Sequence, residues 1–439
     1  MLGRDLYGYA LSTGPEAGGA YVRGVRDLLC LRSGAVEAAA ESIAHDPRFA
    51  LGHAALALLG HELCAPVDVE ARLRDAVIHS VRGTSRERSH VDAVAAHVRG
   101  DSRPLVAHLV AYPRDALLLS IAVPTIAFAG VTEVPEEAWS IVERAAPAYG
   151  DDWWFTGLLA FVRQEQRRFD EAMELSCRSL DEEPSAGHSA HARAHAHYET
   201  GDHAGGILWM DDWLTGDGAA TQSLTHFSWH AALHELSLGD LDAVRRRYVA
   251  QLQPEAGLGC RALVDSGSLL FRWAITPGAT DVPDLGAVAA VTDRDLLERP
   301  ATPFVAMHSA VTMLALGDRD GLVELTRWAT GHAHPVHRDV VAPLGTALLQ
   351  MAAGQYSEAA DALARLDASS HRLGGSDAQR EILEEVRICA LLRADRYDDA
   401  RRVLDARLDR RRSPRDERWR AECRPAMADA VRPEGSRGP

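Results

Sequence analysis

The sequence predicts an all-α protein, a tetratricopeptide-like α-solenoid in which helix–turn–helix repeats stack into a superhelix. Apolar residues recur with helical spacing through most of the 439 residues, and no segment keeps the alternating pattern of a strand. Short polar turns separate many of the helices. Histidine pairs also recur 35 residues apart, close to the period of about 34 residues that tetratricopeptide repeats have.

Residues 1–150 form an N-terminal helical region that is weakly repetitive. We expect helices near residues 68–82, 86–98 and 136–148, with Gly or Pro between them. The longest apolar run, from Ala116 to Val131, is interrupted by Ser120, Pro124 and Thr125. It is shorter than the ~20 residues that a membrane span needs, so the sequence predicts a buried helix there.

In residues 151–412 the tetratricopeptide-like repeats can be recognised from the sequence. Their turns are short and polar, and Gly or Asp recurs in them, because glycine permits a left-handed turn and Asp caps the next helix. The six turns begin at Arg167, Thr200, Leu238, Leu316, Ala353 and Ala394. An insertion near residues 274–300 contains Pro, Gly and one expected short helix. Residues 413–439 are predicted to form a C-terminal helix and a flexible tail.

Composition excludes several classes of function. The net charge of −16 argues against binding to nucleic acid or to an anionic membrane. The chain contains 47 arginines and no lysine, which excludes a pyridoxal phosphate Schiff base and a P-loop nucleotide site. The six cysteines are scattered without a CxxC pair, so we expect free thiols. No secretory signal is apparent, which indicates a cytoplasmic protein. A homodimer is left open.

Several stretches of the chain resemble the tetratricopeptide repeat protein 38 family. The stretches that carry the resemblance are DPRFALGHA (46–54), AHAHYETG (194–201), HFSWHAAL (226–233), VDSGSLLFR (264–272), RDVVAPL (338–344) and HRLGGSDAQREIL (371–383). The resemblance covers nearly the whole chain and implies a right-handed α-helical repeat fold. It implies no defined activity, so function has to be inferred from candidate sites.

The first candidate site consists of two histidine pairs, His191 with His195 and His226 with His230. Each pair is spaced four residues apart, which places both rings on one helical face. The offset of 35 residues places the pairs at equivalent points of neighbouring repeats, so we expect all four rings to face the same groove. Such a cluster could bind a divalent metal, Zn or Fe. A metal-free ligand pocket and a purely structural role are the alternatives, whereas His203 is expected at the surface.

The second candidate site is a polar stripe with a glycine turn. Asp265, Ser268 and Arg272 share one face of an otherwise apolar helix, and such residues are paired or face a cavity. A capped helix start holds Ser376, Gln379 and Arg380, which could bind a carboxylate or phosphate. The alternative is a structural turn with Arg380 bridging repeats. Trp229 beside the histidines could line the ligand site or pack in the core.

We expect the protein to bind a small molecule or a peptide segment in its concave groove. The alternative is an enzyme of small-molecule metabolism whose site is based on histidine and assisted by a metal. An enzyme should close the groove into a pocket with converging titratable groups, whereas a scaffold should keep it open.

Overall fold

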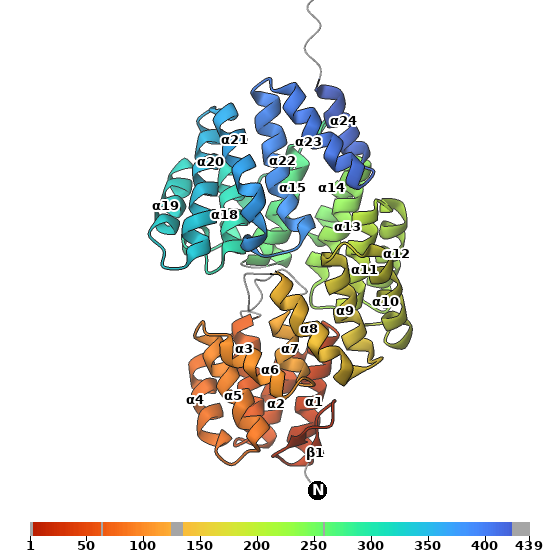
Figure 1. The fold of residues 1–439 in the computed structure, drawn as a ribbon, viewed down its shortest axis with the longest axis vertical. Coiled ribbons are helices and arrows are strands. Elements are labelled where there is room, and N and C mark those ends of the chain that lie inside the picture. The colour runs from red at the N-terminus through yellow and green to blue at the C-terminus, as the bar shows by residue number, and fades with distance from the viewer. Residues whose placement is uncertain (1–2, 63–64, 124–134, 258–259, 424–439) are drawn as a thin grey trace, which may run out of the picture. The chain divides into compact units, whose positions relative to one another are not determined.

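The computed structural model describes residues 3–62, 65–123, 135–257 and 260–423 (Figure 1), and these residues confirm the all-α fold. The first helices are α1 (Pro15–Leu29), α2 (Ala35–His45), α3 (Ala50–Glu62), α4 (Val69–Ser80), α5 (Ser85–Val98), α6 (Arg103–Ala111), α7 (Ala116–Ala122), α8 (Pro135–Tyr149), α9 (Trp153–Glu165), α10 (Phe169–Glu182), α11 (Gly187–Thr200) and α12 (His203–Thr215). Two short antiparallel strands, β1 (Gly3–Arg4) and β2 (Ala10–Leu11), precede them.

The remaining helices are α13 (Leu224–Leu238), α14 (Leu241–Gln251), α15 (Ser268–Ala274), α16 (Gly286–Val291), α17 (Arg294–Glu298), α18 (Pro303–Leu316), α19 (Arg319–Thr330), α20 (Ala342–Ala352), α21 (Tyr356–Leu366), α22 (Asp377–Arg393), α23 (Tyr397–Arg410) and α24 (Pro414–Glu422). Two 3₁₀ segments, η1 (Pro254–Ala256) and η4 (Asp367–Leu373), and two π-helical segments, η2 (Ala262–Gly267) and η3 (His337–Val341), lie between them. Among the described residues, no helix is both long and apolar enough to cross a membrane.

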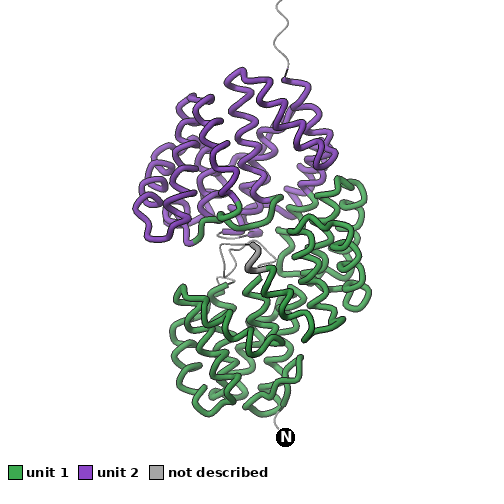
Figure 2. Tube along the Cα trace, in the orientation of Figure 1, with its two compact units in different colours: residues 1–231, 302–304, 371–378 green, residues 232–301, 305–370, 379–439 purple. Residues whose placement is uncertain are grey.

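The chain packs as two compact units, which Figure 2 colours separately. Unit 1 consists of Met1–Ala231, Thr302–Phe304 and His371–Ala378. Unit 2 consists of Ala232–Ala301, Val305–Ser370 and Gln379–Pro439. The boundary predicted near residue 150 marks the point where the repeats become regular, and it stays a prediction.

All six predicted turns contain a residue in the left-handed backbone region. The residues and their φ angles are Arg167 (60°), Gly201 (75°), Gly239 (74°), Gly317 (67°), Gly354 (76°) and Asp395 (54°). In three of these turns the next residue is an Asp that caps the following helix, as Asp202, Asp240 and Asp318 do. Turn and cap together fix where one helix ends and the next begins.

Each unit has its own hydrophobic cores. In unit 1, one cluster of buried side chains runs from Leu11 to Val162, and two smaller clusters surround α11. In unit 2, a cluster from Met351 to Cys423 includes Trp419 of the C-terminal helix. The buried apolar faces of the amphipathic helices therefore account for the packing within each unit.

The structure corrects and completes several predictions about single segments. The apolar run that starts at Ala116 forms α7, and its end lies outside the described residues. The insertion contains two short helices, α16 and α17, where one was expected. Five cysteines are free as predicted, namely Cys30, Cys177, Cys260, Cys389 and Cys423, whereas Cys64 lies outside the described residues.

Removal of one cap should destabilise the helix that it starts. The Asp240 carboxylate accepts a hydrogen bond from the Ala243 backbone N–H at 2.9 Å. We expect Asp240→Ala to lower the free energy of unfolding by about 1 kcal/mol in urea denaturation. Asp242→Ala, in the first turn of the same helix but not its cap residue, is the control. Equal losses in the two variants would contradict a capping role for Asp240.

Candidate functional site

The packing of α11 brings the predicted histidines together. Its four alanines at 190, 192, 194 and 196 are fully buried, and its small residues let neighbouring helices approach closely. A Cβ added at Gly157 on α9 would lie 2.0 Å from the Ser189 hydroxyl, so a larger residue there would force Ser189 on α11 to shift. Phe227 and Ala231 of α13 belong to the same core cluster as Ala190 and Ala194 of α11. The imidazoles on these two helices are therefore forced into one buried space.

Four imidazole nitrogens converge in that space. The Nε2 atom of His191 lies 3.0 Å from Nε2 of His195 and 3.0 Å from Nε2 of His230. It also lies 3.2 Å from Nε2 of His226. The ring centroids of His195 and His230 are 4.5 Å apart. The prediction that the four histidines converge agrees with this geometry, whereas the concave groove stays a prediction.

Aromatic rings enclose the four histidines. Phe161 stacks on His191 with centroids 5.4 Å apart, and Trp229 stacks on His226 at 5.6 Å. The four histidines are only 1–2% exposed. Burial, together with repulsion from His226, lowers the pKa of His195 to about 3. His195 is therefore neutral at pH 7, the form in which imidazole binds metals.

One hydrogen bond cannot account for all three contacts of His191 Nε2. A neutral imidazole carries one N–H, so an Nε2 atom is either a donor or an acceptor. The Nε2 atom of His191 can therefore form one good N–H···N bond, although three nitrogens lie at hydrogen-bond distance. A divalent ion would instead accept the lone pairs of these nitrogens. With metal–nitrogen bonds of about 2.0–2.1 Å, tetrahedral ligands are about 3.3–3.4 Å apart, slightly more than the distances seen here.

The described residues contain three groups whose ligand atoms all lie within 4.8 Å of one another: His191 with His195 and His230, His61 with Glu62 and His97, and His90 with His108 and Asp115. The structure thus contains histidine clusters that could hold a metal. His226 joins the first group through its contact with His191. The other two groups are explained without a metal.

The group around Asp115 is a buried charge network. The Asp115 Oδ2 atom lies 2.8 Å from His90 Nδ1, 3.1 Å from His108 Nε2 and 3.0 Å from Arg86 Nη2. Burial alone would raise the pKa of Asp115, but His90 and Arg86 hold it well below its usual value. The guanidinium of Arg86 already provides the positive charge, which disfavours a metal ion at the same oxygen.

The group around Glu62 is satisfied by ordinary hydrogen bonds. His97 Nε2 lies 2.8 Å from the Glu62 carboxylate, and His97 Nδ1 lies 2.9 Å from the Ser102 hydroxyl. His61 Nε2 is 3.9 Å from the same carboxylate and belongs to an exposed side chain. One tautomer of His97 satisfies both of its contacts, so nothing in this group requires a metal.

Unit 2 contains most of the second predicted site. Asp265 lies in the π-helical segment η2, and Asp265, Ser268 and Arg272 are all buried. The Arg272 guanidinium donates to the Glu385 carboxylate at 3.2 Å and to the Gln379 carbonyl at 3.1 Å. Arg272 therefore has structural partners, and its predicted role in ligand binding is untested.

The helix start predicted after Gly374 and Gly375 lies where the sequence placed it. Helix α22 begins at Asp377, so Ser376 occupies the N-cap position, after Gly374 and Gly375 with φ angles of 84° and 71°. Gln379 is buried and Arg380 is partly buried. Ligand binding by Ser376, Gln379 and Arg380 stays a prediction.

Sequence reasoning missed His308 and misplaced His203. His308 on α18 is 1% exposed. Burial and the nearby Arg272 lower its pKa to about 3, although Asp265 opposes this shift. A single histidine in the apolar stretch FVAMHSAV was the available signal. His203 was expected at the surface, but the structure buries it to 2% exposure, because α12 turns that face inward.

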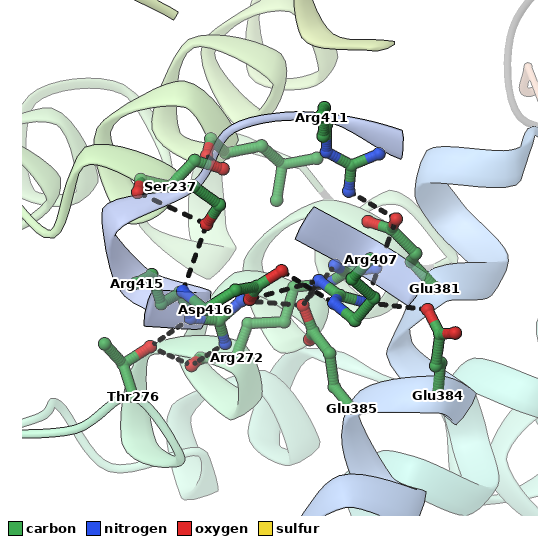
Figure 3. A network of polar contacts seen from close by, with 12 residues as sticks. Ser237, Arg272, Thr276, Glu381, Glu384, Glu385, Arg407, Arg411, Arg415 and Asp416 are labelled. Atoms are coloured by element: carbon green, nitrogen blue, oxygen red, sulfur yellow. Dashed lines mark hydrogen bonds and ion pairs between the residues drawn. The ribbon is translucent and has the colours of Figure 1, made fainter. Parts of the chain in front are cut away.

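Figure 3 shows the ion network in which Arg272 takes part. Glu385 on α22 accepts from Arg272 and from Arg415 of α24, whose Nη1 atom lies 2.6 Å from Oε1. Arg407 lies 3.6 Å from the same carboxylate and 2.8 Å from Asp416. These side chains are 0–4% exposed. The network binds the C-terminal helix to α15, α22 and α23 within unit 2.

A comparison with models of known protein families finds no match for this chain. The resemblance to the tetratricopeptide repeat protein 38 family therefore remains a prediction.

The ion network should make unit 2 sensitive to removal of one charge. We expect Glu385→Gln to lower the free energy of unfolding by about 3–5 kcal/mol at pH 7, because Arg272 and Arg415 would stay buried without their anion. The control is Glu384→Gln on the same helix, where the side chain is 24% exposed and the loss should be smaller.

The difference between wild type and Glu385→Gln should also depend on pH. Burial alone would raise the pKa of Glu385, but Arg272, Arg415 and Arg407 outweigh it and hold the pKa below 4.5. The stabilisation is therefore present above about pH 4.5 and is lost as pH falls through the lower, folded-state pKa. Urea denaturation at several pH values measures this. A difference that stays constant into strong acid would argue against the ion network.

Proposed function

We propose that this protein is a tetratricopeptide-like helical-repeat protein that binds a divalent transition-metal ion within the cluster formed by His191, His195, His226 and His230, and binds a small molecule or a peptide segment there. The observation that carries the proposal is the close contact of Nε2 atoms around His191, at 3.0–3.2 Å. Imidazole ligands suit Zn, Fe, Cu and Ni better than Mg or Ca, and we favour Zn or Fe.

Two features support the repeat part of the proposal. The histidine pairs are 35 residues apart in sequence and occur on α11 and α13, each the first helix of a hairpin. In the hairpins α11–α12 and α13–α14, the turn contains a glycine with left-handed backbone conformation, Gly201 or Gly239. The next residue, Asp202 or Asp240, caps the second helix of the hairpin. This likeness of two successive hairpins is what stacked repeats of one kind require.

One observation favours an enzyme as the second candidate function. Of the four clustered histidines, three have ligand atoms that all lie within 4.8 Å of one another in the described part of the chain, namely His191, His195 and His230. A three-histidine site is typical of catalytic zinc, where a fourth position takes water or substrate. If a metal ion is bound in this way, it would act as a Lewis acid in small-molecule metabolism.

The proposal predicts stoichiometric metal binding that depends on His195. Wild type, stripped with chelator and dialysed against Zn²⁺, should retain one equivalent by elemental analysis. We expect His195→Ala to weaken binding by about a hundredfold or more, since even removal of an outer-shell partner costs 10- to 100-fold. Zinc should stabilise wild type against unfolding by about 4 kcal/mol at a thousandfold excess over Kd, and His195→Ala should lose this gain.

A control on the same helix separates metal binding from folding. His197 Nδ1 forms a hydrogen bond with the Asp202 carboxylate at 3.0 Å. His197 does not belong to the group of His191, His195 and His230. His197→Gln should bind zinc as wild type does. His195→Gln, which keeps a polar side chain of similar size, tests the site if His195→Ala does not fold. Equal melting temperatures of wild type with chelator and with zinc, together with no retained metal, would refute the proposal.

A further inference from the structure

The charge of the histidine site is not balanced by its ligand atoms. An imidazole binds a metal through its lone pair and is neutral when it does so. The group of ligand atoms within 4.8 Å of one another consists of His191, His195 and His230, with no carboxylate among them. A divalent ion held by these three residues would therefore receive no negative charge from its protein ligands.

The surroundings make an unbalanced charge expensive. Phe161 stacks on His191, Phe227 meets the same ring edge-on at 6.1 Å, and Trp229 stacks on His226. The histidines themselves are 1–2% exposed. A charge buried among apolar rings loses its hydration, and this cost is recovered only when a charge of opposite sign lies close to it.

The outer nitrogen of His195 lacks the usual compensation. Metal-binding histidines generally donate their second N–H to a carboxylate or a carbonyl. Elsewhere in unit 1, His90 Nδ1 faces Asp115 at 2.8 Å and His197 Nδ1 faces Asp202 at 3.0 Å. Within the part of the chain that the structure describes, His195 Nδ1 is buried and has no hydrogen-bond partner. Hence no carboxylate reduces the charge of the site through His195.

We infer that the metal ion at His191, His195 and His230 takes a small oxygen-donor anion as a further ligand, and that this anion is the class of ligand or substrate that the site selects. The inference rests on the proposed function. Hydroxide, a carboxylate and a phosphate share the required chemistry, which is a negatively charged oxygen that binds the metal directly. Neutral or cationic ligands would add no negative charge to the metal ion.

The alternative is a closed site in which His226 is the fourth ligand. His226 Nε2 lies 3.2 Å from His191 Nε2, and the His226 ring centroid lies 4.8 Å from that of His230. Four imidazoles would complete a tetrahedral shell and leave no position for an anion. The two arrangements differ in whether an added anion reaches the metal.

Cobalt-substituted protein distinguishes the two arrangements. Co²⁺ is added to the chelator-treated full chain, and the visible spectrum is followed while azide, an anionic probe, is titrated. We expect a saturable change in the cobalt bands of wild type and its loss in His195→Gln. Acetate and inorganic phosphate should compete with azide. If hydroxide is the natural ligand, azide binding should weaken up to tenfold for each pH unit above the pKa of the bound water.

The outcomes separate this inference from the proposed function. If Co²⁺ and Zn²⁺ both fail to bind, the proposed function and the proposed anionic ligand are both refuted. If Co²⁺ binds but azide leaves the wild-type spectrum unchanged, only the inference that the metal takes an anionic ligand is refuted. His226→Ala is then the internal check, because azide binding in that variant alone would identify His226 as the closing fourth ligand. His197→Gln should behave as wild type throughout.

Discussion

The crowding of imidazole nitrogens around His191 is the main physical constraint in the candidate site of this protein. One Nε2 atom cannot form good hydrogen bonds with three others, yet three lie within 3.2 Å of it. The crowding is enforced by packing, because the fully buried alanines of α11 and the close approach at Gly157 leave the rings little space to separate. The proposed metal ion would accept the lone pairs that meet there.

The two polar clusters of the protein illustrate opposite solutions to burial. In unit 2, the Glu385 carboxylate is surrounded by Arg272, Arg407 and Arg415, so opposite charges offset the loss of hydration. Arginine suits this role because its planar guanidinium donates several hydrogen bonds at once, and the chain has no lysine. In unit 1, the histidines meet nitrogen to nitrogen, and three Nε2 atoms compete for the single Nε2 atom of His191. This contrast is why we propose a functional role for the histidines and a structural role for the ion network.

Local patterns allowed much of the fold to be predicted. The six turns were recognised from Gly and Asp, and each contains a left-handed residue in the structure. The four histidines were recognised because a four-residue spacing is a property of one helix and a 35-residue offset is a property of the repeat. Both signals are short-range or periodic, so neither required knowledge of the tertiary structure.

Contacts between distant parts of the chain could not be predicted in the same way. Arg272 and Glu385 are 113 residues apart, and Arg415 reaches Thr276 across 139 residues. No periodicity connects these positions, so Arg272 was interpreted as a ligand-binding residue without its partner. His308 was missed and His203 misplaced for a related reason, because the burial of one histidine depends on which helices cover it.

X-ray absorption at the zinc edge of zinc-loaded protein tests the central claim most directly, because it reports the atoms bound to the metal. We expect three or four nitrogen or oxygen neighbours at about 2.0–2.1 Å, with the multiple scattering characteristic of imidazole rings. Six oxygen neighbours without imidazole scattering, or a protein that retains no zinc after dialysis, would contradict a metal centre at His191, His195, His226 and His230.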